Sequence, residues 1–255
     1  LGVAYQIEVT YDNQLFTSSP DRMPLVEASS LMSWTEDQII TTSINGVDVM
    51  ESSINFDLDV SVPNSEGFHF FQWRFEETYQ VRETDFPDPF GTIPPPCYIT
   101  KKTGSKLFEL LFFNEFSSRQ VTLDDAIVRL FDQSFLSKHI FIMYQHAISE
   151  SYFNYLSQVK TLTESTGTLF DPPSGRVQGN INTIDATVQA IGFFGAIRVD
   201  TSYSVIYPNQ INYTQKDGCL YDPSIADYQY EPYCADCIKL SGSLKEPPIY
   251  WSTVN

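Results

Sequence analysis

Apolar and polar residues alternate from the first positions of the sequence. The apolar members of this first run are Tyr5, Ile7, Val9 and Tyr11. Asp12 and Asn13 then supply residues that favour a tight turn, and an apolar run resumes at Leu15 and Phe16. Because the side chains of a strand point alternately to its two faces, this pattern predicts a β-hairpin. The polar, proline-containing residues 18–25 that follow are expected to connect two units.

Two more alternating runs lie further along the chain. In the first, Ile54, Phe56, Leu58 and Val60 alternate with polar residues, and in the second Phe71, Trp73 and Phe75 share one face. Turn-forming residues 63–67 separate the runs, so we expect them to form a strand pair. Both runs carry charge on the opposite face, which predicts a sheet with one face on a core and one in water.

Other segments are apolar at nearly every position. Residues 107–113 (LFELLFF) and 139–148 (HIFIMYQHAI) are typical of central strands buried on both faces. Between the alternating runs and these segments, residues 85–96 hold five prolines, which remove backbone donors and predict a surface loop.

One segment has the period of a helix, near residues 149–165. Its apolar positions are Tyr152, Tyr155, Leu156, Val159 and Leu162. Ser149 is placed to cap the start, and Thr166 and Gly167 mark the end. Downstream, glycines interrupt two apolar segments and indicate bulges or close backbone approaches. They are Gly175, Gly179, Gly192 and Gly195.

These elements together predict a mainly β protein. We expect a β-sandwich of the immunoglobulin or fibronectin kind with one packed amphipathic helix. Residues 1–25 would be the remnant hairpin of a preceding β domain with its linker, and residues 26–255 the sandwich domain with a disulfide-stapled C-terminal segment. The sequence starts in a strand-like run without the features of a signal peptide, which favours a fragment or processed chain.

Composition narrows the possible partners. The chain has 255 residues, 42% of them apolar, which is enough to build a core without a metal. A formal charge of −17 repels phosphate backbones and disfavours nucleic acid as a partner. The apolar runs are shorter than the roughly 20 residues of a membrane helix, so any membrane attachment would depend on a lipid anchor outside this chain.

The four cysteines allow three kinds of site. They are Cys97, Cys219, Cys234 and Cys237. A zinc ribbon would need a second Cys-x-x-Cys pair, and the acidic flanks of the pair at 234–237 disfavour the thiolate of a redox motif. Two structural disulfides formed in an oxidising compartment fit best. A bond within the pair would close a tiny loop, so we expect one of its cysteines to bond to Cys219 and the other to Cys97.

Catalysis has little support in the sequence. The three histidines, His69, His139 and His146, lie in expected strands, and the motifs of nucleophilic, metal-dependent or phosphate-binding enzymes are missing. The carboxylate pairs at 57 and 59 and at 124 and 125 are typical of a solvated face or loop. We therefore expect no enzyme activity, no cofactor and no metal.

Aromatic residues could line a binding surface for sugars or peptides. The candidates are Trp34, Trp73, Trp251 and the loop DYQYEPY, residues 227–233. Trp73 alternates with Phe71 and Phe75, which favours a place in the core, and Trp251 is expected to pack the last segment against the domain.

The order of features resembles a known family. The segments that carry the resemblance are AYQIEVTYDNQLFTSS, PPPCYIT, LFELLFF, SYFNYLSQV, GTLFDPPSGRVQGNI, IGFFGA, YCADC and PPIYW. Their order over nearly all 255 residues is similar to that in the Bacteroidota lipoproteins classed as domain of unknown function 4249. GNI, GFF and the Cys-x-Asp-Cys pair are the most specific elements.

The resemblance implies an exported outer-membrane lipoprotein with β-sandwich modules. It also implies a location at the cell surface, or on the periplasmic face, and association with an outer-membrane β-barrel of the TonB-dependent transporter type. The lipidated cysteine and further β domain of such proteins are not found in this sequence, and the family has no established catalytic residues to carry over. A non-enzymatic accessory subunit in ligand capture is the leading hypothesis. The alternative is a structural or assembly subunit of a larger envelope complex that holds no small ligand.

Overall fold

The computed structural model describes most of the chain, with gaps at several loops. The described residues are 3–26, 28–44, 47–63, 67–84, 94–103, 108–114, 119–164, 177–183, 188, 190–213, 217–226 and 229–254. Strand is the main secondary structure of these residues, and α1 (Glu150–Glu164) is the one long helix among them. Within the described residues, no helix has the length and apolar character needed to cross a membrane.

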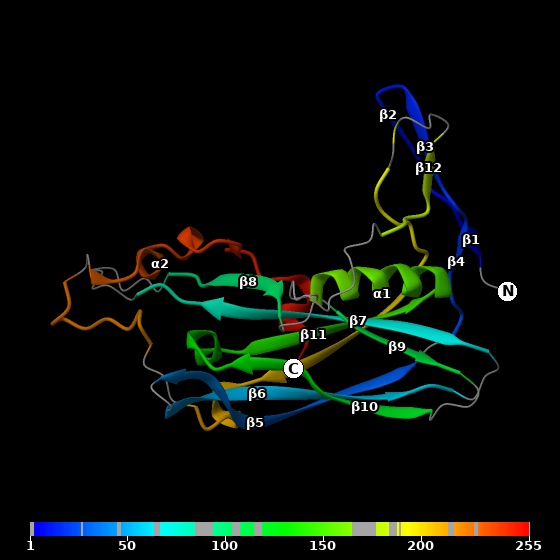
Figure 1. Cartoon of the computed structure of the whole chain (residues 1–255). Helices are drawn as coiled ribbons and strands as arrows, with labels where there is room; N and C mark the ends of the chain where they lie inside the picture. Colours follow the sequence, from blue (N-terminus) through cyan, green and yellow to red (C-terminus); the bar gives the residue numbers. More distant parts are fainter. Residues whose placement is uncertain are drawn as a thin grey trace.

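Two facing antiparallel sheets form the body of the protein (Figure 1). The smaller sheet has the order β10-β6-β5 and consists of β5 (Ser29–Ile44), β6 (Val47–Ser61) and β10 (Gln120–Leu130). The larger sheet has the order β13-β11-β7-β8-β14, with β9 also paired to β7. Its strands are β7 (His69–Val81), β8 (Cys97–Lys102), β9 (Glu109–Phe113), β11 (His139–Ile148), β13 (Arg198–Ile206) and β14 (Ser243–Leu244).

The main core fills the space between the two sheets. Alternate residues of β6 meet alternate residues of β7 and β11 there, and the rings of Phe56 and Phe141 lie 4.4 Å apart. Trp73 is fully buried in this core, as the sequence predicts, and its indole N–H donates to Gln145 at 3.2 Å. The mainly β class with sandwich-like packing is confirmed.

The other face of the larger sheet is also covered. Leu156 of α1 packs on Ile148 and Phe108, while Trp251 packs near Ile140 and Ile142. Ser149 caps α1 by accepting the N–H of Tyr152 at 3.2 Å, as predicted, although Leu162 is on the exposed side. The predicted end of the helix at residues 166 and 167 lies outside the described residues.

The predicted strand pair is wrong. Ile54–Val60 belongs to β6 and Phe71–Phe75 to β7, and these strands lie in opposite sheets that face each other across the core. Alternation shows which side of a strand is apolar but does not identify the neighbouring strand. The true neighbours of β6 are β5 and β10. The outer face of β6 shows charge to water at Asp59 and that of β7 at Arg74, although α1 and the C-terminal segment cover other parts of β7.

Of the two segments expected to be central strands, one is confirmed. β11 lies between β7 and β13 and is buried along nearly its whole length. By contrast, β9 pairs only with β7 in the described structure, and Phe112 is 52% exposed, so the expectation for residues 107–113 is wrong. An edge position leaves one side of a strand without a neighbour whatever its hydrophobicity. Residues 85–93 of the predicted proline-rich loop lie outside the described residues, and 94–96 form no regular structure.

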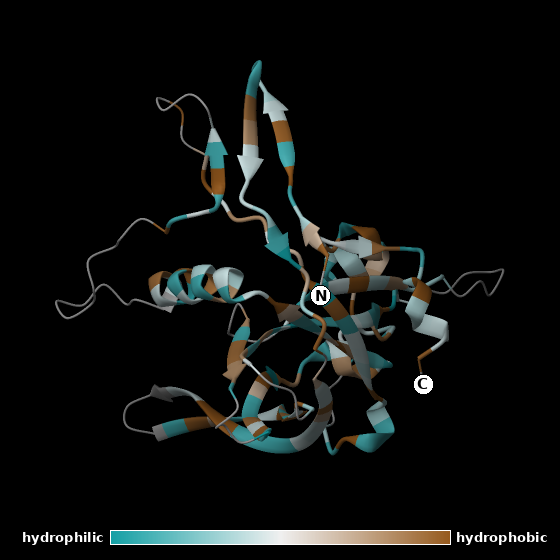
Figure 2. Cartoon of the chain, turned by 90° about the vertical axis from the view of Figure 1, so that its right-hand side faces the viewer, coloured by the Kyte–Doolittle hydropathy of each residue, from teal (hydrophilic) through white to brown (hydrophobic). Residues whose placement is uncertain are grey.

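The predicted N-terminal hairpin is formed by β2 (Glu8–Tyr11) and β3 (Gln14–Ser18). Asp12 and Asn13 both have positive φ, as a two-residue hairpin turn requires. β12 (Ile181–Thr183) adds to β3, and the resulting sheet stands clear of the sandwich (Figures 1 and 2). The short pair β1 (Ala4–Tyr5) and β4 (Asp21–Arg22) lies at its base. The division of the chain at residue 25 stays a prediction.

Close contacts between residues 179–180 and 192–195 fix the base of this small sheet. The side chain of Asn180 accepts the N–H of Phe194 and donates to its carbonyl, both at 2.8 Å. Gly179 lies so close to Gly192 that an added Cβ would be 1.8 Å from the Gly192 carbonyl oxygen, and Gly195 lies directly on the ring of Tyr152. The predicted close approaches are confirmed at these glycines, while Gly175 lies outside the described residues. The GNI and GFF motifs thus lock two segments together.

We expect Gly179→Ala to destabilise the protein, because its methyl group would displace backbone rather than a mobile side chain. The free energy of unfolding should fall by about 2 kcal/mol, within the range for overpacked sites, when measured by urea denaturation of the disulfide-intact chain. Gly218→Ala is the matched control, since its added Cβ would meet only the end of the Gln133 side chain. Equal stability of the two variants would contradict the close approach.

Candidate functional site

Two disulfides hold the C-terminal segment in place. Cys97, at the start of β8, is bonded to Cys237, at the start of η4 (Cys237–Lys239). Cys219 is bonded to Cys234 within the short helix α2 (Pro232–Ala235). Both cysteines of the Cys-x-x-Cys pair therefore have partners outside the pair. Glu83 lies close to Cys97 and Cys237, but the two sulfurs are bonded to each other and do not offer thiolate ligands to a metal.

Polar contacts add to the disulfides. The backbone N–H of Cys237 donates to Glu83 at 2.9 Å, and Lys245 forms an ion pair with the same carboxylate at 2.5 Å. The backbone N–H of Thr84 donates to the carbonyl of Cys234 at 2.7 Å. The residues just after β7 thus bind the C-terminal segment at several points, so this segment forms a fixed wall.

A cleft of about 410 Å³ lies between this wall and the end of the sandwich. Three parts of the chain line it: the end of β7, the turn containing η1 (Gln133–Leu136), and the disulfide-bonded segment. The lining residues are Tyr79, Gln80, Val81, Arg82, Asp132, Gln133, Ser134, Leu136, Ser137, Asp217, Cys219, Tyr233 and Leu240. Tyr233 connects the walls, because its hydroxyl donates to Gln133 at 3.0 Å.

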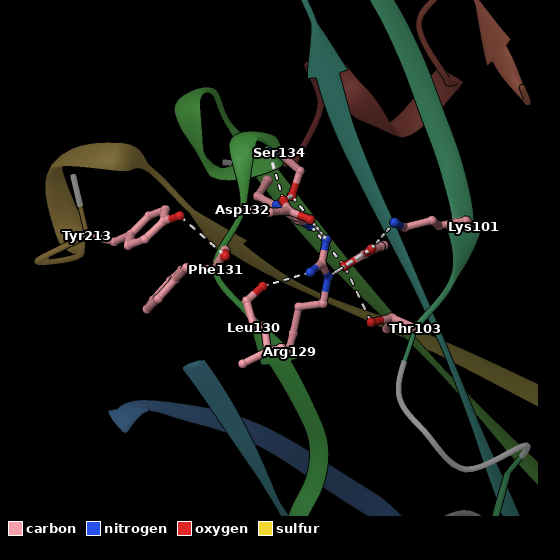
Figure 3. Close-up of polar contacts among 10 residues, drawn as sticks. Lys101, Thr103, Arg129, Leu130, Phe131, Asp132, Ser134 and Tyr213 are labelled. Carbon is pink, nitrogen blue, oxygen red and sulfur yellow. Dashed lines mark hydrogen bonds and ion pairs between the residues drawn. The ribbon is translucent and has the colours of Figure 1, made fainter. Parts of the chain in front are cut away.

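A buried charge network lies next to the cleft, between the two sheets (Figure 3). Glu77 of β7 is fully buried. Arg129 of β10 donates its Nε–H to both Glu77 oxygens, at 3.1 and 3.0 Å, and Lys101 of β8 pairs with Glu77 at 3.1 Å. His139 Nε2 lies 3.2 Å from a Glu77 oxygen, and the Thr103 hydroxyl donates to the Glu77 carboxylate at 3.3 Å. One carboxylate therefore connects four strands.

The neighbouring charges change the pKa values in this network. Burial alone would raise the pKa of Glu77, but the hydrogen bond and charge of His139 and the charges of Arg129 and Lys101 lower it to about 2. Burial lowers the pKa of His139 despite the opposing effect of Glu77. Nδ1 of His139 has no hydrogen-bond partner among the described residues, so a protonated ring would bury an unsatisfied N–H. At neutral pH, Glu77 is therefore ionised beside a neutral His139, and His139 adds its charge to those of Arg129 and Lys101 only when acid protonates the ring.

The network reaches the cleft through Arg129. Its Nη2 donates to Asp132 at 2.6 Å and to Ser134 at 3.3 Å, and both of these residues line the cleft. Asp132 also accepts the N–H of Ser134 at 2.8 Å and its hydroxyl at 2.5 Å. Ser134 is thus engaged by Asp132 and Arg129, and no histidine hydrogen-bonds to it within the described residues. These polar groups are arranged to hold the shape of the cleft.

Comparison with known proteins identifies the family. A family model described as Domain of unknown function (DUF4249) matches residues 1–202. The chain belongs to the DUF4249 family. No curated protein and no solved structure matches it.

The matched residues cover only part of the site in this DUF4249 chain. They include Glu77, Arg129 and His139 of the network and Cys97 of one disulfide. The other three cysteines and the residues of the C-terminal wall lie beyond residue 202. The resemblance inferred from YCADC and PPIYW therefore extends further than the matched family model.

The other residues singled out from the sequence have structural roles. Trp34 is half-buried against the main core, and Trp251 packs on Tyr98 with ring centroids 5.1 Å apart. In the loop at 227–233, Tyr233 lines the cleft, whereas the hydroxyl of Tyr230 accepts the N–H of Asp222 within its own loop.

The carboxylate pairs lie on the outer face of the smaller sheet. Asp57 accepts the N–H of Asp125 at 2.9 Å, and Asp59 accepts the hydroxyl of Thr122 at 2.6 Å. Asp125 has a positive φ, where the ladder between β10 and β6 is irregular. The pairs stabilise this bulge, away from the cleft.

Sequence reasoning missed the charge network. One signal was present: Glu77 continues the alternation of Phe71, Trp73 and Phe75, so it occupies a position that faces the core. His139 is likewise in register with Phe141 and Met143. Charged residues are almost never fully buried without partners, so this register predicts a cation close by. It does not identify Arg129, which comes from the opposite sheet.

We expect Glu77→Gln to cost about 3–5 kcal/mol of unfolding free energy, because it removes the buried counter-charge of Arg129 and leaves only the half-exposed carboxylate of Asp132 beside it. Urea denaturation would measure the loss. Glu246→Gln, at an exposed position, should change stability by less than about 0.5 kcal/mol. Adding Arg129→Met to Glu77→Gln should restore part of the lost stability, and no recovery would show that the loss has another cause.

The free energy of unfolding should also fall in acid, because both lowered pKa values act in that direction. A histidine whose pKa is lower in the folded than in the unfolded state binds fewer protons when the protein is folded. The contribution of His139 to the free energy of unfolding is therefore lost as the pH falls below about 6.5. Glu77 contributes fully above the ordinary glutamate pKa of 4.5, and this contribution is lost as the pH falls toward 2. Urea midpoints across this range would show the decline. Its absence would contradict an ionised Glu77 beside a neutral His139.

Proposed function

We propose that this DUF4249 chain is a non-catalytic, surface-exposed outer-membrane lipoprotein that captures a ligand for a β-barrel of the TonB-dependent transporter type. The observation that carries the proposal is the cleft. Two disulfides and the Tyr233 contact fix its walls. A preformed cleft loses little conformational entropy when a ligand enters, which favours binding.

The lining of the cleft supports capture of a small molecule with polar and apolar parts. Tyr79, Tyr233, Leu136 and Leu240 offer apolar surface, and Gln133 and Ser137 offer hydrogen bonds. Asp132 and Ser134 are held by Arg129 and by each other, so they favour orientation of a ligand over proton transfer. Binding without turnover is the function that this arrangement supports best.

Composition and family support the location. Two disulfides are typical of proteins that fold in an oxidising compartment, such as the bacterial cell envelope. The charge of −17 disfavours nucleic acid and anionic lipid headgroups. Attachment to the membrane would then depend on a lipid anchor outside this chain, as the family resemblance implies.

One observation favours a second candidate, a structural or assembly subunit without a small ligand. The small sheet that stands clear of the sandwich has Ile7, Val9 and Tyr11 on one face, with exposed fractions of 39%, 47% and 75%. An apolar surface of this kind is typical of contacts between proteins. Such a subunit would act through this face, and the cleft would stay empty.

The test is purification of the tagged full-length protein from its native membrane in mild detergent. We expect an outer-membrane barrel protein to co-purify, and Leu136→Arg, which fills the cleft with a charged side chain, to reduce ligand uptake by about tenfold without releasing the barrel. Leu244→Arg is the matched control, because Leu244 is 65% exposed and lies outside the cleft.

Two outcomes would count against capture. Purification without any barrel protein would rule out the transporter association. Unchanged uptake in Leu136→Arg, combined with loss of the partner in a Val9→Lys, Tyr11→Lys double variant, would instead support the assembly subunit.

A further inference from the structure

The strands β5 and β6 extend beyond the sandwich as a two-stranded ribbon. The pairing of β6 with β10 stops at Ser53 and Leu130, whereas β5 and β6 stay paired to their tips at Ile44 and Val47. A groove of about 630 Å³ lies at the base of this ribbon, a volume within the range of ligand sites. Both strands contribute to its lining, so the ribbon forms one wall of a candidate binding site.

The groove lies across one face of the ribbon. Gln38 and Ser52 are directly opposite each other in the ladder between β5 and β6, and both line the groove. Glu36 and Met50 lie two residues away from them along each strand, so their side chains point to the same face. Ile54, which is opposite Glu36, faces the core on this side. The groove therefore continues the inner face of the smaller sheet beyond the end of the core.

Two stacked rings border this face. The rings of Phe131 and Tyr213, which both line the groove, have centroids 4.8 Å apart and planes inclined by 15°. The Tyr213 hydroxyl donates to the Phe131 carbonyl at 3.3 Å (Figure 3), and Glu36 accepts the backbone N–H of Asn212 at 2.9 Å. These contacts hold residues 212 and 213 at the ribbon. The groove is thus preformed, with an aromatic ring on one side.

The floor of the groove has polar groups that are available to a ligand. Among the described residues, neither the side-chain amide of Gln38 nor the hydroxyl of Ser52 has a hydrogen-bond partner. Each of these groups can both donate and accept. The Glu36 carboxylate already accepts from Asn212, but a carboxylate has room for further donors. Uncharged donors and acceptors therefore lie beside an aromatic ring.

This combination disfavours charged and fully apolar ligands. An anion would be repelled by Glu36 and by Asp37, which also lines the groove. An apolar ligand would remove Gln38 and Ser52 from water without replacing their hydrogen bonds. A simple cation would pair with Glu36 but would leave the other polar groups unbonded.

A sugar chain matches all of these groups. A sugar with equatorial substituents has hydroxyls around its rim, which donate and accept, and two flat faces of C–H groups. The hydroxyls suit Gln38, Ser52 and Glu36, and a C–H face can stack on the ring of Tyr213. Met50, which is 49% exposed, offers apolar surface to a second sugar.

We propose that this groove binds a neutral oligosaccharide of β-linked sugars whose substituents are equatorial. One sugar stacks on Tyr213, and the hydroxyls of this sugar and its neighbour bond to Gln38 and Ser52. Glu36 accepts from a further hydroxyl while it holds Asn212. This site is separate from the ligand cleft and does not depend on what the cleft holds.

The test is isothermal titration calorimetry of the full chain with cellotetraose and with chitotetraose, two neutral β-linked tetrasaccharides. We expect at least one of them to bind with a dissociation constant below about 1 mM. Gln38→Ala combined with Ser52→Ala should weaken binding about tenfold, because two hydrogen bonds are lost. Ser33→Ala combined with Gln158→Ala removes the same groups at exposed positions outside the groove and should leave the affinity within about twofold.

The aromatic ring is tested separately. Tyr213→Ala should weaken binding about tenfold, because the stacking surface is lost. Tyr213→Phe keeps the ring and should bind within about twofold of the unmodified chain. Equal weakening by both variants would assign the effect to the hydroxyl that bonds to Phe131 and would contradict stacking of a sugar.

Each other outcome would overturn the proposal. No binding of either tetrasaccharide at about 1 mM, or equal weakening in the control double variant, would mean that the groove does not hold a sugar chain. Equal binding of the corresponding tetramer of glucuronic acid would mean that the groove does not select a neutral ligand. Binding of spermidine as tight as that of the sugars would identify a site for amines.

Discussion

The buried carboxylate of Glu77 is the constraint on which one end of the molecule depends. A charge that is fully removed from water costs several kcal/mol unless cations and donors surround it. Here these come from β8, β10 and β11, so the two sheets can close at this end only when Lys101, Arg129 and His139 all reach one point. Elsewhere the core is mainly apolar, apart from contacts such as that of Gln145 with Trp73, whereas the Glu77 network fixes both register and distance between the sheets.

Arg129 transmits this constraint to the surface. After bonding to Glu77, its guanidinium also donates to the Leu130 carbonyl at 2.7 Å and to Asp132 at 2.6 Å, so the chain leaving β10 is held rigidly. Within this short stretch, Phe131 lines the groove under the β5 and β6 ribbon, and Asp132 and Ser134 line the cleft (Figure 3). The two surfaces thus share one wall. Neither can change shape at this wall without straining the contact between Arg129 and Glu77.

Local patterns in the sequence predict the elements of this fold better than their neighbours. The hairpin turn at Asp12 and Asn13 and the Ser149 cap follow from contacts within a few residues. The assignment of β6 and β7 to opposite sheets does not, because it depends on pairings over many residues that alternation leaves open. The charge network is an intermediate case. The register of Glu77 shows that a carboxylate is buried, but the cation that balances it lies on the facing sheet.

The C-terminal wall of the cleft depends on different interactions from the sandwich. Among the described residues of this segment, Trp251 and Tyr250 pack on a hydrophobic cluster of the sheet and β14 pairs with β8, while the disulfides, Glu83, Thr84 and the Tyr233 contact hold the wall itself. The family match ends at residue 202, within β13, so it includes most of the sandwich, the Glu77 network and the η1 side of the cleft, and excludes this wall. A ligand in the cleft would contact both sides, whereas the family match covers only one of them. Membership of the DUF4249 family therefore describes the scaffold and not the whole cleft. Which ligand fits depends also on Tyr233, Leu240 and the loops that the disulfides hold in place.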